Sequence, residues 1–205
     1  MYLHHVMART RDGVGYNAGS AVRMRGPARA AAKGALACLV RSIGTDSTRA
    51  AHTGAVFYEP GAEIPAAALS TPDGDRLARA LLGGKEVVSH LALTCRPLPV
   101  GESANVIGEI RGRERPDEIV LLGAHLDSWD LSVGAQDDGA GCAIVLEVGR
   151  MIAALPRAPR RTVRLVLFAN EELGTGGGLA YARAHASEAA RHVAALEADQ
   201  GAPSP

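Results

Sequence analysis

The residues of this chain that could do chemistry gather in three short acidic clusters. The first lies in GAHLDSWDLSVGAQDDGAG at positions 123–141, the second is NEELG at 170–174, and the third is EADQG at 197–201. A short apolar run precedes each cluster, and such runs are typical of buried strands. Because an open parallel sheet presents its ligands beyond the carboxyl ends of its strands, we expect the three clusters to share one crevice.

The residue types in these clusters suit a pair of divalent metals. Such a pair needs a carboxylate that bridges both ions and terminal ligands on each side, usually a histidine nitrogen or a carboxylate oxygen. By type, His125 is the predicted terminal nitrogen ligand and Asp137 the predicted bridge. Glu172 and Asp199 are the predicted terminal oxygen ligands on opposite metals.

Two further carboxylates lie beside these ligands. Glu171 is left free next to Glu172, and hydrolysis needs such a base near a water whose pKa a metal lowers towards roughly 7. Asp127 follows His125 by two residues, so both side chains would point to the same side of an extended segment. Glu171 is therefore the candidate general base, and Asp127 is a candidate for orienting the imidazole.

The order of these motifs resembles peptidase family M28, the zinc aminopeptidases and carboxypeptidases. The shared order is HxD, DD, EE and ExD, with a strand before each motif and a helix after DDGAG. Within the family, HLDSWD, the twelve-residue step to the DD motif, and KGALACLVRSIGTDS followed by HTG resemble the carboxypeptidase Q group most. The resemblance runs over nearly the whole chain.

The resemblance implies a site and an activity. The implied zinc ligands are His125, Asp137, Glu172 and Asp199. Glu171 would be the general base with Asp127 as its helper, and the peptide bond between Asp137 and Asp138 would be cis. The implied enzyme is an exopeptidase with two zinc ions per site that hydrolyses dipeptides or short peptides.

Two departures from the family pattern affect this expectation. The family supplies a last histidine ligand well after the ExD motif, whereas this chain ends at Pro205. Members also begin with catalytic-domain strands ahead of an inserted segment. We therefore expect a fragment truncated at both ends, with one metal held by His125, Asp137 and Asp199 and the other by Asp137 and Glu172 alone. Weak or no activity is expected from the isolated chain.

Other interpretations remain open at this point. A lone histidine at a strand end is usually structural, and DD or EE pairs often serve as helix N-terminal acids, as Asp138 could. The chain could be a non-catalytic fragment that acts as a binding module. It could also be a two-metal hydrolase of another substrate class, because metals and a base do not name the substrate.

Composition limits the other partners. The formal net charge is zero, which gives no basis for binding nucleic acid or an anionic membrane. No apolar run reaches the length of a membrane span, and no export signal is visible, although the family resemblance suggests a secreted or periplasmic full-length protein. A peptide substrate and a possible homodimer are the expected partners. Three cysteines without metal-type spacing are predicted to be buried free thiols, namely Cys38, Cys95 and Cys142.

The predicted organisation is an α/β fold in two parts. Residues 1–100 are expected to form a protease-associated-like, β-rich insert, with helices at 27–40 and 73–82 and a strand at 54–58. Residues 101–205 are expected to form part of an M28 zinc-exopeptidase core, with helices on both faces of its sheet. Its predicted strands are 105–110, 118–123, 162–168 and 193–196, and its predicted helices are 138–155 and 178–190.

Overall fold

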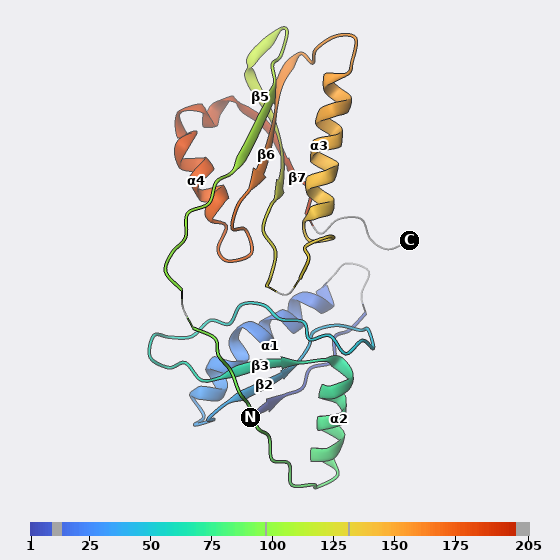
Figure 1. Cartoon of the computed structure of the whole chain (residues 1–205), viewed down its shortest axis with the longest axis vertical. Coiled ribbons are helices and arrows are strands. Elements are labelled where there is room, and N and C mark those ends of the chain that lie inside the picture. The colour runs from blue at the N-terminus through green and yellow to red at the C-terminus, as the bar shows by residue number, and fades with distance from the viewer. Residues whose placement is uncertain (10–13, 97, 131, 200–205) are drawn as a thin grey trace. The chain divides into compact units, whose positions relative to one another are not determined.

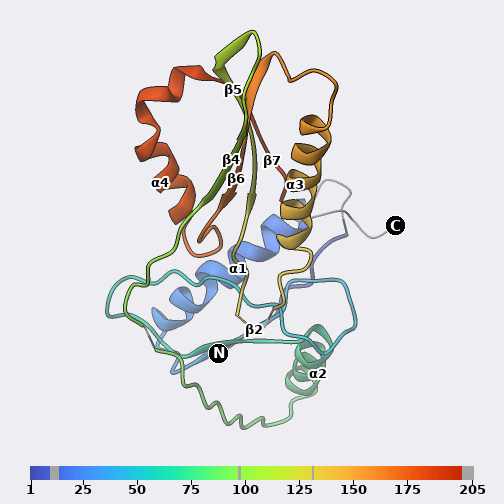
Figure 2. The same ribbon diagram turned by 45° about the horizontal axis from the view of Figure 1, so that its top comes forward.

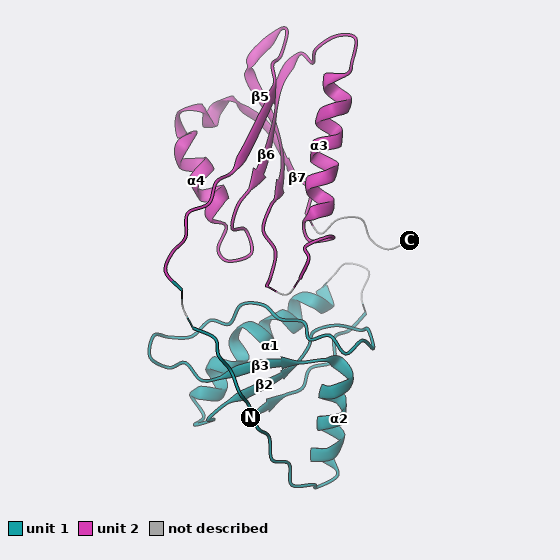
Figure 3. Ribbon diagram, in the orientation of Figure 1, with its two compact units in different colours: residues 1–98 teal, residues 99–205 magenta. Residues whose placement is uncertain are grey.

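The computed structural model describes residues 1–9, 14–96, 98–130 and 132–199. The chain forms two compact units, Met1–Leu98 and Pro99–Pro205, which Figure 3 colours separately. Both units combine helices with a sheet, so the α/β class expected from the sequence is confirmed. The assignment of the first unit to a protease-associated-like insert stays a prediction.

The first unit contains a small parallel sheet and two helices. Its strands lie in the order β1, β2, β3, and both pairs are parallel. The elements are β1 (Tyr2–Leu3), α1 (Val14–Ala31), β2 (Cys38–Arg41), β3 (Ala66–Leu69) and α2 (Thr71–Leu82). Strands of two to four residues beside helices of 18 and 12 residues do not make a β-rich unit, so that part of the expectation is wrong.

Two local predictions in this unit are also wrong. The helix expected over 27–40 ends at Ala31. After it, Gly34 adopts a positive φ of 79°, and the backbone N–H groups of residues 34 and 35 donate to carbonyl groups of the last helical turn. Strand β2 follows, and the side chains of Cys38 and Val40, two residues apart on it, both pack into the core. The run at 54–58 contains no strand, and Phe57 is 57% exposed. The helix expected at 73–82 is confirmed by α2.

The second unit is built on a four-stranded sheet (Figure 1). The strand order is β4, β6, β5, β7; β4 runs antiparallel to β6, whereas β5 is parallel to both neighbours. The elements are β4 (Val106–Ile110), β5 (Arg115–His125), α3 (Gly139–Ala153), β6 (Arg161–Phe168), α4 (Gly176–Ala184), the 3-10 helix η1 (Ala186–Arg191) and β7 (His192–Glu197). All four predicted strands and both predicted helices of this part are present, the second helix being completed by η1.

Helices cover both faces of this sheet, as Figures 1 and 2 show. On the face of α4, Leu121 and Val166 pack with Tyr181. On the face of α3, Ala124 and Leu167 pack with Val145. Neighbouring residues of one strand thus enter opposite cores, which follows from the alternation of side chains along a strand. In the described part of the chain, every helix is too short or too polar to cross a membrane.

The cysteines differ from one another in exposure. Cys38 is buried and Cys142 is partly buried, whereas Cys95 is exposed. Cys95 lies in the irregular segment between α2 and β4. The prediction of three buried thiols is therefore wrong for Cys95.

Candidate metal centre

Three neighbouring parallel strands of the second unit's sheet, β6, β5 and β7, have their carboxyl ends side by side. In the parallel pairing, His125 of β5 lies opposite Phe168 of β6, and Gly123 of β5 lies opposite Glu197 of β7. The HxD, EE and ExD motifs therefore leave the sheet at the same edge. This is the edge at which open parallel sheets bind their ligands.

Three of the predicted ligands come together at this edge. One ligand atom each from His125, Asp137 and Asp199 lies within 4.8 Å of the others. His125 Nε2 is 3.0 Å from Asp137 Oδ1 and 3.5 Å from Asp199 Oδ1. The imidazole is 1% exposed, while the two carboxylate side chains are 48% and 45% exposed, so the group opens to solvent on its acidic side. Glu172 is not part of this group.

The backbone around His125 fixes which ring nitrogen faces the carboxylates. Nδ1 lies 3.0 Å from the carbonyl oxygen of Asp127, which can only accept a hydrogen bond, so Nδ1 must carry the proton. Nε2 is thus the nitrogen that faces Asp137 and Asp199, and in the neutral imidazole it carries the lone pair that a metal ion would bind. A histidine ligand whose other nitrogen donates to a carbonyl is the arrangement that metal sites use.

The donor set fits a divalent metal. Asp137 Oδ1 is buried and accepts no hydrogen bond from the described residues, although His125 Nε2 is close. An unpaired buried oxygen costs free energy unless a cation satisfies it. Two ligand atoms about 2.0 Å from a tetrahedral zinc ion lie about 3.3 Å apart. The two separations from Nε2, 3.0 and 3.5 Å, bracket that value.

Burial, the Asp127 carbonyl and nearby carboxylates together set the pKa of the imidazole. Burial lowers the pKa of His125, but the hydrogen bond to Asp127 and the negative charges of Asp138 and Asp137 outweigh it, and the net pKa is raised. The surroundings of Nε2 thus favour a positive charge. A divalent cation would meet the same field.

Asp127 contacts the loop that carries the two glutamates. Its Oδ1 accepts the backbone N–H of Glu171 at 2.8 Å, and its Oδ2 accepts that of Glu172 at 3.1 Å. Its carboxylate is 3.8 Å from His125 Nδ1, so the carbonyl and not the carboxylate orients the imidazole. Asp127 therefore links the histidine to both glutamates: its carbonyl binds the imidazole, and its carboxylate binds the backbone N–H groups of the glutamates.

Both glutamates have raised pKa values. Burial is the main cause of the raised pKa of Glu171; Asp199 and Asp127 add to it, whereas His125 opposes it. Burial also leads for Glu172, with a further rise from Asp137 and a decrease from the hydrogen bond with Trp129. A carboxyl group whose pKa is raised towards neutrality can both accept and return a proton, which is the property a general base needs.

Asp138 has a contact that the sequence did not reveal. Its Oδ1 accepts the N–H of Gly141 at 3.0 Å and so caps the first turn of α3, as expected for a helix N-terminal acid. Its Oδ2 accepts the backbone N–H of His125 at 2.9 Å. Cys142 Sγ lies 3.1 Å from the His125 carbonyl oxygen, so α3 holds the backbone of His125 on both sides. The Asp137-Asp138 peptide bond is cis, as the family resemblance implied.

Comparison with known proteins places the segment that carries these clusters in a family. Residues 105–204 match the family described as Peptidase family M28. This segment contains every residue of the three clusters. Residues 105–204 belong to peptidase family M28.

Individual M28 relatives extend the similarity to the first unit. Carboxypeptidase Q of Bos taurus is 37% identical over 187 residues, which cover 91% of this chain and 40% of that protein. The human carboxypeptidase Q is 37% identical over 180 residues, which cover 87% of this chain and 38% of that protein. The chain thus spans about two fifths of the length of these curated relatives.

Solved structures agree with the M28 assignment. The crystal structure of a peptidase M28 precursor from Shewanella amazonensis matches with a TM-score of 0.85 and 44% identity, covering 98% of this chain and 46% of that one. An aminopeptidase from Aneurinibacillus matches with a TM-score of 0.52 and 25% identity, covering 85% and 42%. The fold described above is therefore shared with M28 peptidases over both units.

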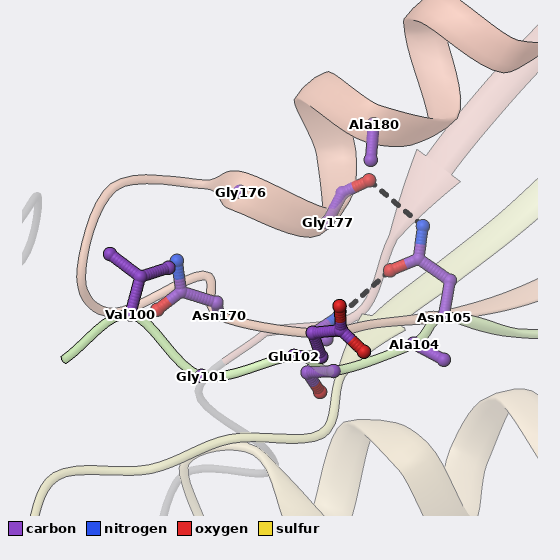
Figure 4. A pocket seen from close by; sticks show the side chains of 11 residues that line it. Val100, Gly101, Glu102, Ala104, Asn105, Asn170, Gly176, Gly177 and Ala180 are labelled. Atoms are coloured by element: carbon purple, nitrogen blue, oxygen red, sulfur yellow. Dashed lines mark hydrogen bonds between the residues drawn. The ribbon is translucent and has the colours of Figure 1, made fainter.

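A cavity of about 670 Å³ lies between the segment that precedes β4 and the loop that follows β6. Figure 4 shows its lining, which comes from residues 100–105, from Asn170 and from the beginning of α4. Asn170 directly precedes Glu171, so one wall of the cavity belongs to the loop that carries both glutamates.

Proposed function

We propose that this chain carries the site of a zinc-dependent exopeptidase that hydrolyses dipeptides or short peptides. The observation that supports this most is the group of His125, Asp137 and Asp199, in which Nε2 faces both carboxylates and Asp137 Oδ1 lacks a hydrogen-bond partner among the described residues. Membership in family M28 supplies the reaction class, and the similarity to carboxypeptidase Q favours small peptide substrates.

The proposed ligands divide between two zinc ions. His125, Asp137 and Asp199 would hold the first ion, and Asp137 would bridge to a second ion held by Glu172. One histidine nitrogen with carboxylate oxygens is a donor set suited to zinc. Bound zinc would lower the pKa of a water and polarise the scissile carbonyl. Because Glu172 and the bridge are the only ligands assigned to the second ion, we propose that the isolated chain works slowly.

Glu171 is the proposed general base. Its carboxylate would accept the proton of the attacking water and pass it to the nitrogen of the leaving amine. Its raised pKa, caused mainly by burial, suits both steps. Asp127 would keep this carboxylate in place by binding the backbone N–H groups of Glu171 and Glu172.

The proposal is tested by peptide hydrolysis at saturating zinc. We expect slow, chelator-sensitive hydrolysis of dipeptides by the wild-type chain, reduced about 10²- to 10⁴-fold by Glu171→Gln. Glu147→Gln is the matched control, because Glu147 is an exposed glutamate on α3 paired with Arg150. Equal rates for the two variants would contradict the role of Glu171.

The same assay separates the alternatives. Hydrolysis of phosphoesters or non-peptide amides in preference to dipeptides would indicate a two-metal hydrolase of another class. Complete absence of turnover at saturating zinc would favour a non-catalytic binding fragment. Fast turnover would contradict our expectation that this chain alone is impaired.

Finer aspects of the biology are also proposals. The partner of the site would be a peptide, and the neutral net charge gives no basis for a nucleic acid or membrane partner. A homodimer is possible for the full-length protein, and its proposed location is outside the cytoplasm, from the family resemblance. Size measurement in solution and fractionation of cells would test these two points.

A further inference from the structure

The loop from Ala169 to Gly177 carries both glutamates of the proposed site. It joins β6 to α4, and it contains two non-glycine residues with positive φ, Asn170 at 54° and Thr175 at 55°. Such conformations are sparsely populated and persist only where surrounding contacts impose them. The position of Glu171 and Glu172 therefore depends on what holds this loop.

Asn105 closes the base of the loop. Its side-chain Nδ2 donates to the carbonyl oxygen of Gly177 at 2.8 Å, and its Oδ1 accepts the backbone N–H of Ala169 at 3.0 Å, as the dashed lines in Figure 4 show. The two loop ends also bond to each other, since the N–H of Gly177 donates to the carbonyl of Ala169 at 2.7 Å. One amide side chain thus satisfies the remaining backbone groups at both ends.

The clamp leaves little freedom at its contact with α4. A Cβ atom added at Gly177 would lie 2.3 Å from the Ala169 carbonyl oxygen and 2.4 Å from Asn105 Oδ1. Only the present orientation of the amide offers a donor to Gly177 and an acceptor to Ala169. Asn105 directly precedes β4, and its two partners, Ala169 and Gly177, lie 64 and 72 residues further along the chain.

Two side chains therefore fix this loop from opposite sides. Asn105 holds its base from the β4 side, and Asp127 holds Glu171 and Glu172 from the β5 side. Asp127 belongs to the HxD motif of the site, whereas Asn105 lies outside all three acidic clusters.

We propose that Asn105 is a positioning residue that holds the Glu171 and Glu172 carboxyl groups towards the metal centre. The proposal rests on the function proposed above. Without the clamp, the base of the loop opens, the positive φ of Asn170 relaxes, and the N–H groups of both glutamates leave Asp127. The metal centre then loses the fixed position of a ligand and of the general base.

The test compares Asn105→Ala with a matched variant at the other end of β6. Thr162 is also a buried clamp: its Oγ1 accepts the N–H of Gly112 at 3.1 Å and donates to the carbonyl of Pro116 at 2.7 Å. Thr162→Val removes two side-chain hydrogen bonds, as Asn105→Ala does. It does so at the amino-terminal end of β6, whereas the acidic clusters follow the carboxyl ends of the strands. Asn105→Asp keeps the acceptor for Ala169 and loses the donor to Gly177.

The first readout is amide hydrogen exchange of the full 205-residue chain by NMR. We expect Asn105→Ala to speed exchange at the Glu171 and Glu172 amides about 10-fold or more relative to Thr162→Val, with Asn105→Asp between wild type and Asn105→Ala. The second readout is the affinity for a second zinc ion, the one assigned to Glu172, measured by titrating zinc into the one-zinc chain. Loss of a partner that orients ligands typically weakens metal binding about 10- to 100-fold, and we expect this for Asn105→Ala but not for Thr162→Val.

The outcomes separate this proposal from the function on which it rests. Equal exchange at both glutamates in Asn105→Ala and Thr162→Val overturns the positioning role. Unchanged affinity for the second zinc ion in Asn105→Ala overturns it as well. A wild-type chain that binds no zinc overturns the proposed function instead, and the exchange comparison then still decides whether Asn105 holds the loop.

Discussion

Replacing Asp138 should destabilise the second unit more than the loss of a helix cap explains. The carboxylate is 1% exposed and accepts two backbone N–H groups, one from Gly141 at the start of α3 and one from His125 at the end of β5. Asp138→Ala removes both acceptors. It should therefore affect the helix and the strand end that carries His125 together.

The expected cost follows from these two bonds. Loss of an aspartate N-cap costs about 1 kcal/mol, within a range of roughly 0.5–2. Leaving the buried N–H of His125 unsatisfied costs about 1–3 kcal/mol more. We therefore expect Asp138→Ala to lower the free energy of unfolding by about 2–4 kcal/mol, a large part of the roughly 5–15 kcal/mol typical of a domain.

The measurement is urea unfolding at neutral pH with excess chelator, so that metal binding does not contribute. Asp130→Ala is the control, because Asp130 is an exposed aspartate in the same inter-strand segment and should change stability by less than about 0.5 kcal/mol. Asp138→Asn keeps one oxygen and should fall between wild type and Asp138→Ala. A cost below about 1 kcal/mol for Asp138→Ala would refute the two-bond account.

Three other predictions concern packing, acid stability and thiol reactivity. Gly177→Ala should destabilise the chain by about 1–3 kcal/mol in thermal unfolding, because its Cβ would clash with the backbone. Gly178→Ala is the control: its Cβ would have no atom within 4 Å, so the variant should be neutral or more stable by up to about 1 kcal/mol. The pKa of Asp75 is lowered to about 2, chiefly by the hydrogen bond from Arg41. The carboxylate therefore stabilises the first unit fully above pH about 4, and this stabilisation is lost as the pH falls through about 2. In Asp75→Asn, the free energy of unfolding should depend less steeply on pH in this range. Ellman's reagent should modify Cys95 of the native chain quickly and the other two thiols only after unfolding; three equally fast thiols would contradict the burial.

The ligand group could be foreseen because it depends on where strands end. His125 ends β5, and the segment carrying Asp199 follows β7, its parallel neighbour, so sequence order and sheet geometry bring them together. The contacts that fix the group could not be foreseen. Asp138 and Asn105 bind backbone N–H and carbonyl groups 13 to 72 residues away, and a backbone group carries no sequence signal. The two uses of Asp127 depend on the path of the loop in the same way.

The fold was predictable to different extents in the two units. In the second unit, runs such as Leu165 to Phe168 are apolar without a break because both faces of the strand are covered, and they indicate strands clearly. In the first unit, the strands are four residues or shorter, and the Ala- and Gly-rich sequence around β2 lacks a clear period. The helical break at Gly34 and the start of β2 are decided by packing of Cys38 and Val40 against Ala30, which is a tertiary contact.

The central claim, that His125, Asp137 and Asp199 hold a divalent metal, is tested most directly by zinc content after dialysis. Elemental analysis should find about one zinc per chain in the wild type and in the control His90→Ala, which removes an exposed histidine of the first unit. His125→Ala should lose that zinc. Absence of zinc from the wild type, or equal zinc in the wild type and His125→Ala, would contradict the claim.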